Sequence, residues 1–455
     1  MTPSVLRYSD QIPQMSPQMD FNYLTMIPSN GSSFTANQEV RIPINVPTDS
    51  FVDMKRAYIK FKLTNNAAAA DNSLALLDPV VGAASIISTF RVVSGTGALL
   101  EEIQHYDALV AIMNNHKNAD VRQSRGAITM GQSQVPMTAE SISVDAGVAE
   151  AAGVGGKQTI GATKSKIFYH EPVSAVFNAD KLFPFGFTQG TSYVSLTLNS
   201  QNGGITQYSD ATNSAAAWTA SEWELYLPVL RPGAEFANNF RTLIQSGLPI
   251  NIHSVGFQNS QQNIAQNATG MQTITFSTRK RSVKSIMTAL RINGQLSLIT
   301  CNSSSGFKHN DAVDYQYSVG GRRIPSAPIK VNSLTDGLDL GGAFNNTLLA
   351  LGHYDSNLRG ASCDVDAQHR KYMQNVADDN DRSSSVAFSL DLESYGEGLS
   401  GMNLAGQGLP LVLYLNCGAG AARASTVGAL LADLYVIHDV IFTLDGVSGT
   451  LSASS

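Results

Sequence analysis

Apolar and polar residues alternate in two neighbouring stretches near the start of the chain. Residues 39–46 (EVRIPINV) place Val or Ile at every second position, and residues 58–63 (YIKFKL) alternate apolar residues with lysines. A side-chain period of two predicts half-buried strands. Pro43 cannot donate a ladder hydrogen bond, so its strand is expected at a sheet edge or bulge. With the turn-forming Pro-Thr-Asp-Ser at 47–50 between them, we expect the two strands to form an antiparallel pair.

Comparable strand patterns recur along the whole chain and are separated by turn-forming residues. Two short helices are expected, at 104–115 and 346–351, and the proline-containing residues 320–331 are expected to form an extended connection. Many short strands between turn signals indicate β-sandwiches or barrels. The remaining predicted strands are 86–93, 98–103, 166–170, 193–198, 223–230, 271–276, 285–292, 315–319, 386–392, 411–415 and 434–444.

The two halves of the chain end in a similar way. YVSLTLNS, a loop of small residues and WELYLPVL close the first half, while LVLYLNCG, a similar loop and LYVIHDVIF close the second. We interpret this as two similar β domains in tandem, with the boundary at Arg231-Pro232-Gly233. Residues 1–28, rich in Pro, Gln, Ser and Met, predict an extended arm whose removal would leave the barrels folded. The small residues of 119–165 predict a long loop.

Charge is sparse in this chain. Charged residues make up 15% of it, hydrophobic residues 43%, and the net charge is −6. Low charge suits a surface covered by copies of the same protein, although a neutral soluble protein fits equally well. The densest basic patch, Arg279 to Arg281 with Lys284 and Arg291, indicates a solvated or interface face. Because neither end carries a basic run, direct nucleic-acid binding is not expected.

Cysteines and apolar runs exclude several classes. Cys301, Cys363 and Cys417 are far apart and form no CxxC pair, so neither a disulfide framework nor a zinc site is predicted. The N-terminal residues do not resemble a signal peptide. No apolar run approaches the roughly 18 residues that cross a bilayer. Folding inside a cell fits these features.

Motifs for catalysis, cofactors or metals are incomplete. Gly95-x-Gly97 lacks the third glycine of a dinucleotide fingerprint, and Gly156-Lys157 lacks the rest of a phosphate loop. Residues 379–383 could begin a calcium loop, but Ser384 stands at the position of its glycine and Leu390 at that of its glutamate. Cys363 and neighbouring His and Asp residues within 353–369 are interpreted as structural, and His438-Asp439 as a packed or hydrogen-bonded pair. We therefore predict no catalytic, cofactor-binding or metal-binding residues.

Several longer blocks resemble a known family. GSSFTANQEVRIPINVPTDSFVDMKRAYIKFKLT and SGTGALLEEIQHYDAL resemble the first barrel of double jelly-roll major capsid proteins of eukaryotic double-stranded DNA viruses, such as polinton-like viruses, adintoviruses and virophages. RSVKSIMTALRI, YSVGGRRIPSAPIKV, VAFSLDLES, SGMNL and YVIHDVIFTLDGVSGTLS are similar to the second barrel. The resemblance implies an all-β fold of two tandem eight-stranded jelly rolls, at 29–232 and 233–455, with short helices in loops.

The resemblance also implies a structural function. Three chains would supply six barrels to a pseudo-hexameric homotrimer in the icosahedral shell of a virion assembled inside the host cell. Partners would be neighbouring capsomers, penton and minor capsid proteins, without direct nucleic-acid contact, and an internal membrane beneath the shell is possible. No enzymatic activity is implied. The N-terminal arm and the residues after Gly446 would be candidates for contacts with neighbours.

Two alternatives come from other classes. A viral attachment or carbohydrate-binding β protein should expose aromatic residues beside Asp/Asn clusters, but Trp218 and Trp223 are the only tryptophans and Trp223 is interpreted as core. A β-sandwich hydrolase would need a carboxylate pair or nucleophile that the motifs do not supply. A glycan array would separate an attachment protein from a capsid protein.

Overall fold

The computed structural model describes most of the chain, and the following account is confined to that part. The described residues are 19–67, 74–78, 80–116, 122–132, 159–201, 203–208, 217–247, 249–265, 268–293, 304–305, 307, 312–331, 341–352, 386–393, 399–405, 410–418, 429–446 and 448–455.

The first half of the chain forms two main antiparallel sheets. One has the order β1-β13-β5-β10, and the short β2 and β4 also pair with β13; the other has the order β3-β11-β7-β8. A small third sheet has the order β12-β6-β9. The strands are β1 (Met19–Met26), β2 (Ser33–Phe34), β3 (Glu39–Ile44), β4 (Phe51–Val52), β5 (Tyr58–Asn65), β6 (Leu74–Leu77), β7 (Ile87–Val93), β8 (Leu99–Gln104), β9 (Thr159–Ile160), β10 (Ser165–His170), β11 (Ser192–Leu198), β12 (Ile205–Tyr208) and β13 (Trp218–Pro232).

The second half forms another pair of antiparallel sheets. Their orders are β14-β21-β16-β19, with β22 added beside β21, and β15-β20-β17-β18. The strands are β14 (Ile250–Ile264), β15 (Gly270–Phe276), β16 (Val283–Ile292), β17 (Ala312–Val319), β18 (Arg322–Lys330), β19 (Phe388–Asp391), β20 (Leu411–Cys417), β21 (Leu430–Leu444) and β22 (Leu451–Ser454).

The same strand order is present in both halves. Ranked along the chain, the main strands of each half follow the order 1-8-3-6 in one sheet and 2-7-4-5 in the other. This order is that of a jelly roll, in which successive strands cross between two facing sheets. The predicted all-β double jelly roll is therefore confirmed. The predicted count of eight strands applies to these main paths only, because β2, β4 and β22 also join the sheets.

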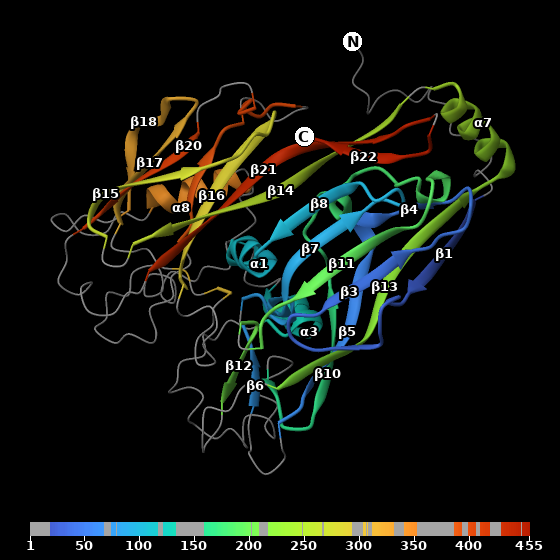
Figure 1. Cartoon of the computed structure of the whole chain (residues 1–455), viewed down its shortest axis with the longest axis horizontal. Helices are drawn as coiled ribbons and strands as arrows, with labels where there is room; N and C mark the ends of the chain where they lie inside the picture. Colours follow the sequence, from blue (N-terminus) through green and yellow to red (C-terminus); the bar gives the residue numbers. More distant parts are fainter. Residues whose placement is uncertain are drawn as a thin grey trace, which may run out of the picture.

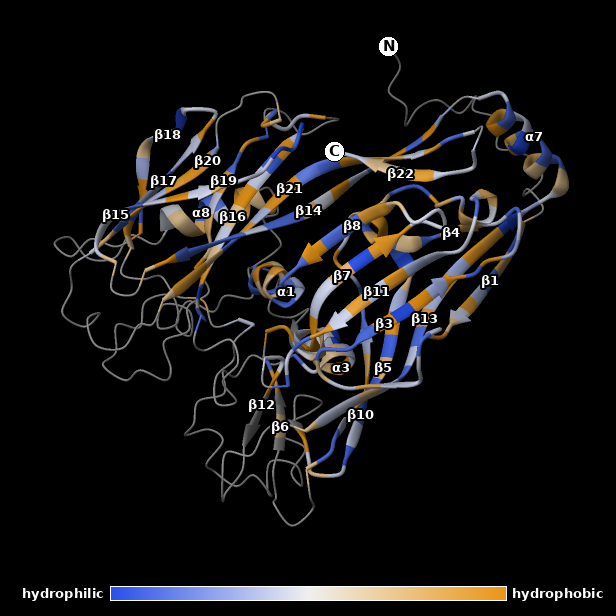
Figure 2. Ribbon diagram, viewed as in Figure 1, coloured by the Kyte–Doolittle hydropathy of each residue, from blue (hydrophilic) through white to orange (hydrophobic). Residues whose placement is uncertain are grey.

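Alternation of apolar residues explains which face each strand buries. Ile59, Phe61 and Leu63 of β5 are fully buried, while the intervening lysines are partly exposed. Figure 2 shows apolar and polar positions alternating along most strands of both barrels. Pro43 lies in β3, which forms the edge of its sheet, so that prediction is confirmed. The hairpin of β7 and β8 closes through the predicted Ser94–Gly97 turn, where Ser94 N–H donates to the Ala98 carbonyl.

The predicted pairing of the first two strands is wrong. β3 pairs with β11, and β5 pairs with β10 and β13, so the two strands lie in opposite sheets. The connection between them contains β4 and a 3-10 helix (Met54–Arg56) and crosses from one sheet to the other. A jelly roll places most consecutive strands in opposite sheets, apart from hairpins such as β7–β8, and side-chain alternation carries no information about which partner a strand takes.

The prediction of an arm over residues 1–28 also needs correction. Residues 19–26 form β1, which pairs with β13 from Met19 opposite Pro232 to Met26 opposite Leu225. Residues 1–18 lie outside the described part of the chain. Removing residues 1–28 would thus remove a strand of the first barrel, contrary to our expectation. The domain boundary near 232 stays a prediction, although β13 ends at Pro232.

Several elements of the second half differ from the predictions. Residues 322–330, expected to be an extended connection, form strand β18 and pair with β17. The 15-residue strand β14 and the helix α7 (Ala234–Gln245) carry no prediction. The predicted helices correspond to α1 (Tyr106–Asn115) and α8 (Gly341–Ala350). The remaining helical segments are two 3-10 turns (Ala83–Ile86 and Phe185–Phe187), a π-helix (Arg122–Gly126), α3 (Ala127–Met130) and α6 (Ala175–Asn178).

Candidate functional site

The two barrels meet along a buried junction. Figure 1 shows α1 and β8 of the first barrel beside the second barrel, with β14 and β21 extending over the first barrel towards α7. β14 contacts β8 and α6. Ile252 and Phe257 of β14 and Phe442 of β21 belong to the same hydrophobic cluster as the core of the first barrel. The junction is therefore continuous with a core, which favours a fixed relation between the barrels.

A buried charge cluster crosses this junction. Arg291 of β16 is 2% exposed and donates to Asp433 of β21 through Nε at 2.7 Å. Its guanidinium also lies 2.5 Å from His105 Nδ1 and 3.7 Å from the Asp107 carboxylate, both in the first barrel. Although burial opposes its charge, Asp433 and Asp107 hold the pKa of Arg291 above its ordinary value. The cluster joins charged groups of both barrels, so loss of any one of them would leave the others buried without their partner.

The start of α1 is shaped by the same contacts. His105, the residue before the helix, has φ 47° and ψ 48°, a left-handed conformation that a residue with a Cβ rarely adopts. Its carbonyl accepts from Tyr435 Oη at 2.7 Å and from the Ala108 N–H at 3.1 Å. Contacts from both barrels thus offset the conformational cost at this residue.

A second polar contact lies further along the junction. Glu101 of β8 is buried and accepts from the Ala175 N–H of α6 at 2.7 Å and from the Phe257 N–H of β14 at 3.4 Å. Burial raises the pKa of Glu101 to about 7. Ser254 of β14 donates to the Ala175 carbonyl at 2.6 Å. One carboxyl therefore links three elements from both barrels.

Close backbone approach beside Glu101 requires a glycine. A Cβ on Gly256 of β14 would lie 2.6 Å from the Val440 side chain, 3.3 Å from the Ala175 side chain and 3.4 Å from Glu101 Oε1. Val440 is β-branched and stiff, so it has little freedom to move aside. Gly256 therefore leaves room for the Val440 side chain of the neighbouring strand β21 and, less tightly, for Ala175 and Glu101 of the first barrel.

The C-terminal segment packs against its own chain. β22 pairs with β21 and contacts β8, and Leu451 is buried. Lys280 donates to the Ser455 hydroxyl at 2.6 Å, and the Gln189 N–H donates to the Gly449 carbonyl at 2.8 Å. The residues after Gly446 are thus ordered on their own chain, and their contact with neighbours stays a prediction.

The junction has the chemistry of a structural contact. His438 and Asp439 are buried in β21, and His438 Nδ1 lies 3.2 Å from the Asp439 carbonyl, as expected for a packed pair. Burial lowers the pKa of His438 to about 4, so the ring is neutral near pH 7. The described residues contain no group of three or more His, Cys, Asp or Glu side chains placed to hold a metal ion. None of the described helices combines the length and apolar character needed to span a membrane.

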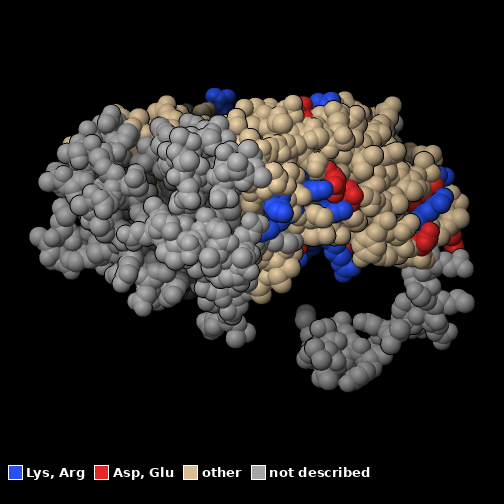
Figure 3. All heavy atoms as spheres, turned by 90° about the horizontal axis from the view of Figure 1, so that it is seen from below, with Lys and Arg blue, Asp and Glu red and all other residues tan. Residues whose placement is uncertain are grey.

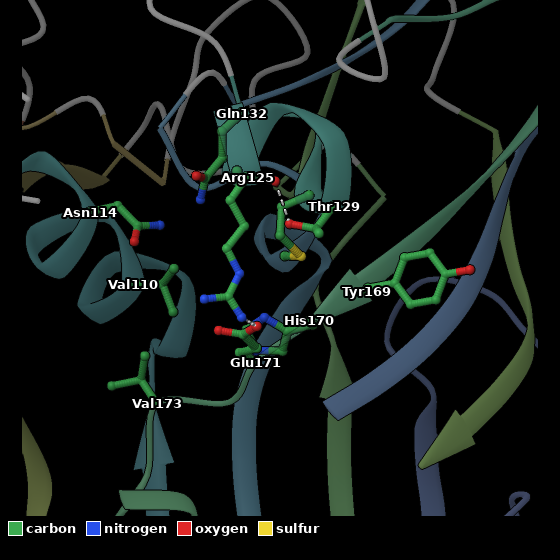
Figure 4. Close-up of a pocket in the computed structure, with 11 residues that line it drawn as sticks. Val110, Asn114, Arg125, Thr129, Gln132, Tyr169, His170, Glu171 and Val173 are labelled. Atoms are coloured by element: carbon green, nitrogen blue, oxygen red, sulfur yellow. Dashed lines mark hydrogen bonds and ion pairs between the residues drawn. The ribbon is translucent and has the colours of Figure 1, made fainter. Parts of the chain in front are cut away.

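A surface cavity of about 250 Å³ lies between α1, the π-helix with α3, and the end of β10. Figure 4 shows the Arg125 side chain reaching across this cavity to Glu171, with which it forms an ion pair. His170 lies at its base and is hydrogen-bonded to Tyr106 Oη at 2.8 Å. The other residues lining the cavity are Val110, Asn114, Gly126, Thr129, Met130, Gln132, Tyr169 and Val173. The ion pair forms part of the cavity wall, and no nucleophile and base are paired there among the residues named.

Several residues considered in the sequence are placed differently or lie outside the described part. Arg291 is buried, so it does not belong to a solvated basic face; the acidic partners that stabilise it are far away in sequence. Arg279 and Arg281 are exposed, Gly95 and Gly97 form the β7–β8 turn, and Cys417 is buried. Cys301, Gly156-Lys157, residues 353–369 and residues 379–383 lie outside the described residues.

The junction residues are the ones that sequence reasoning missed. A signal was present: Glu224-Leu225-Tyr226 and Asp433-Leu434-Tyr435 repeat the same residue types in the last long strand of each half. Glu101, by contrast, is adjacent to the half-exposed Glu102, and alternation alone does not distinguish the two.

Charge is dispersed over the described part of the face drawn in Figure 3. Figure 3 shows one face of the molecule, where basic and acidic side chains form small mixed groups on a largely uncharged surface. Exposed ion pairs such as Lys62–Glu222 and Lys55–Asp180 belong to this kind of surface. Mixed groups of this kind do not form the continuous basic stripe typical of a nucleic-acid interface.

Similarity to known proteins is confined to structure. No protein-family model and no curated protein sequence matches the chain. A structure of VP54 from PBCV-1, fitted into a reconstruction of the virophage Sputnik, matches 98% of this chain and 99% of its own with a TM-score of 0.56 and 12% identity. The Faustovirus major capsid protein matches 95% of this chain and 92% of its own with a TM-score of 0.56 and 11% identity. The PBCV-1 virus capsid matches 98% and 100%, with a TM-score of 0.54 and 11% identity. The chain therefore has the double jelly-roll fold of these viral capsid structures.

Proposed function

We propose that the chain is a major capsid protein that builds the icosahedral shell of a double-stranded DNA virus. The observation that carries this proposal is the pair of jelly rolls joined by a buried junction, matched over nearly the whole chain by the Faustovirus major capsid protein. A rigid two-barrel unit suits a lattice, because three copies provide six similar barrels to one pseudo-hexameric trimer. The protein is located in the virion and is assembled inside the host cell.

The partners follow from this function. They are two further copies of the chain in the trimer, then neighbouring capsomers, penton and minor capsid proteins. The net charge of −6 and the small mixed charge groups support a shell without direct nucleic-acid contact, with an internal membrane as a further possible layer. The function lies in surfaces and not in catalysis.

An attachment or carbohydrate-binding function is less well supported. Trp218 is 3% exposed and Trp223 1% exposed, and Trp223 stacks on Phe61 inside the first barrel with ring centroids 4.4 Å apart. Both tryptophans therefore stabilise the core and do not form a sugar-binding platform.

Native mass measurement and negative-stain imaging of the purified chain test the proposal. A species of three times the 48.4 kDa chain mass with hexagonal outlines is expected. A monomer or a pentamer would contradict it, and a glycan array would then test the attachment function. Removal of residues 1–18, which spares β1, tests whether the arm contributes to lattice formation; unchanged particle yield would argue against that role.

A further inference from the structure

The helix between β13 and β14 exposes an apolar stripe. In α7, Phe236 is 52% exposed and Leu243 is 43% exposed. Phe240 lies between them and is partly buried, and residues at intervals of three and four positions share one face of a helix. We name Phe236, Phe240 and Leu243 the α7 stripe. A contiguous apolar surface of this kind indicates a site that another segment or molecule covers.

α7 is held firmly at the end of the first barrel (Figure 1). The Phe240 ring centroid lies 5.0 Å from that of Phe51 in β4 and 4.8 Å from that of Phe187. Arg241 Nε donates to the Asp49 carboxylate at 2.8 Å. The α7 stripe is therefore a fixed surface of the barrel, and its exposure does not arise from a detached helix.

Residues 1–18 are attached to the barrel beside this helix. Met19, the first residue of β1, pairs with Pro232 of β13, and α7 begins two residues later at Ala234. β1 is antiparallel to β13, so the end of β1 to which residues 1–18 are joined is the end at which β13 leads into α7. Strand pairing thus brings this segment to the start of α7.

Two apolar residues of segment 1–18 match the spacing of the α7 stripe. Ile12 and Met15 are three residues apart, and Pro13 between them favours an extended chain. Three extended residues span about 10 Å, and the seven residues from Phe236 to Leu243 rise about 10 Å along the helix. The seven residues from Ile12 to β1 span about 23 Å when extended, which exceeds the roughly 14 Å that α7 rises from its start to Leu243.

We propose that segment 1–18 runs along α7 of its own chain in an extended conformation and covers the α7 stripe. Met15 packs on Phe236 and Ile12 packs on Leu243, so that apolar surface on both sides is removed from water. The contact lies within one chain, so this inference does not depend on the capsid function. In a capsid, only the residues before Ile12 would remain to reach a neighbouring molecule.

Other partners fit the α7 stripe less well. The charged residues of α7 are Glu235 and Arg241, and Arg241 is already paired with Asp49. A helix that binds a membrane surface carries Lys or Arg along its polar face. Segment 1–18 needs no such charge, because its direct attachment to β1 gives it a high effective concentration at the α7 stripe.

Cysteine cross-linking tests the contact directly. The double variant Ile12→Cys with Leu243→Cys is oxidised in dilute solution, and mass spectrometry of its digest is expected to find the peptide of residue 12 linked to that of residue 243. Ile12→Cys with Met271→Cys is the matched control, because Met271 is 56% exposed on β15 of the second barrel, and it should give no corresponding link. Absence of the first link, or equal yields in the two variants, would overturn the proposal.

A mixing experiment identifies the chain whose α7 is covered. Chains with Ile12→Cys alone and chains with Leu243→Cys alone are mixed and oxidised, and no dimer joined through these two positions is expected. A cross-linked species of twice 48.4 kDa that joins residues 12 and 243 would show that the segment binds another copy and would overturn the assignment to its own chain.

Methionine oxidation measures the cover without introduced cysteines. In wild type, hydrogen peroxide should convert Met15 to the sulfoxide more slowly than the exposed Met271 of the same molecule, as localised by mass spectrometry. Phe236→Asp should raise the rate at Met15 by about tenfold and leave that at Met271 unchanged, because reaction of a covered residue follows the population of its released form. Thermal unfolding verifies that the variant is folded. Equal rates at Met15 in wild type and variant would contradict the proposed cover, whatever the oligomeric state of the chain.

Discussion

Glu224-Leu225-Tyr226 in the first barrel and Asp433-Leu434-Tyr435 in the second show how environment changes the contribution of the same residue types to stability. In the second barrel, Arg291 and Asp433 are buried and contact another barrel, and in the first barrel Lys60 and Glu224 retain contact with solvent. Solvent screens the outer pair, so its contribution to stability is small in an isolated chain. The buried set has lost its solvation, so each remaining charge depends on its partner. The same residue types therefore belong to the barrel junction at one place and to a partly exposed ion pair at the other.

The largest effect is expected from Arg291→Leu. The substitution leaves Asp433 and Asp107 buried without their cation, which should lower the free energy of unfolding by roughly 3–5 kcal/mol. Lys60→Leu is the matched control and should change it by only about 0–1 kcal/mol in dilute, dissociated chains. Urea unfolding of both variants measures the difference, and equal losses would contradict the contrast between the two sets.

The next effect depends on pH and concerns Glu101. Its pKa is about 7 in the folded chain and 4.5 in the reference state, so the folded chain binds the proton more tightly. Stability should fall as pH rises from about 4.5 to 7, by on the order of 3 kcal/mol, and then level off. Two other titratable groups face the same region. Burial lowers the pKa of Lys280, while the charge of Glu101 raises it, and His438 is neutral.

Glu101→Gln isolates this contribution. The amide cannot ionise, so the difference in unfolding free energy between wild type and variant should change with pH only across this window. Urea unfolding at several pH values between 4 and 8 measures it. Parallel pH curves for the two proteins would show that Glu101 is not the titrating group.

A smaller effect is expected from Gly256→Ala. The added methyl meets Val440 at 2.6 Å, and overpacking of this kind costs about 1–3 kcal/mol. Gly342→Ala in α8 is the control, since its Cβ would have only ordinary contacts from 3.6 Å and alanine favours a helix. Thermal unfolding should separate the two, and equal stability would mean that Val440 or β14 shifts to accommodate the methyl group.

Alternation in the sequence determined the strands, because side-chain direction along a strand depends only on neighbouring positions. It therefore placed β5 and β11. The missing N–H of Pro43 predicted its edge position, and the repeated strand endings indicated two similar domains. Sequence periodicity also predicted α1 and α8.

Only the tertiary structure decided which strands pair and which polar residues are buried. Partners far away in sequence place β3 and β5 in opposite sheets and make residues 19–26 strand β1. They also account for the burial of Arg291. The junction follows the same rule: Glu101 and Glu102 are adjacent in one strand, but only Glu101 faces the second barrel. Contacts between distant residues set the environment of a side chain, and no local pattern contains that environment.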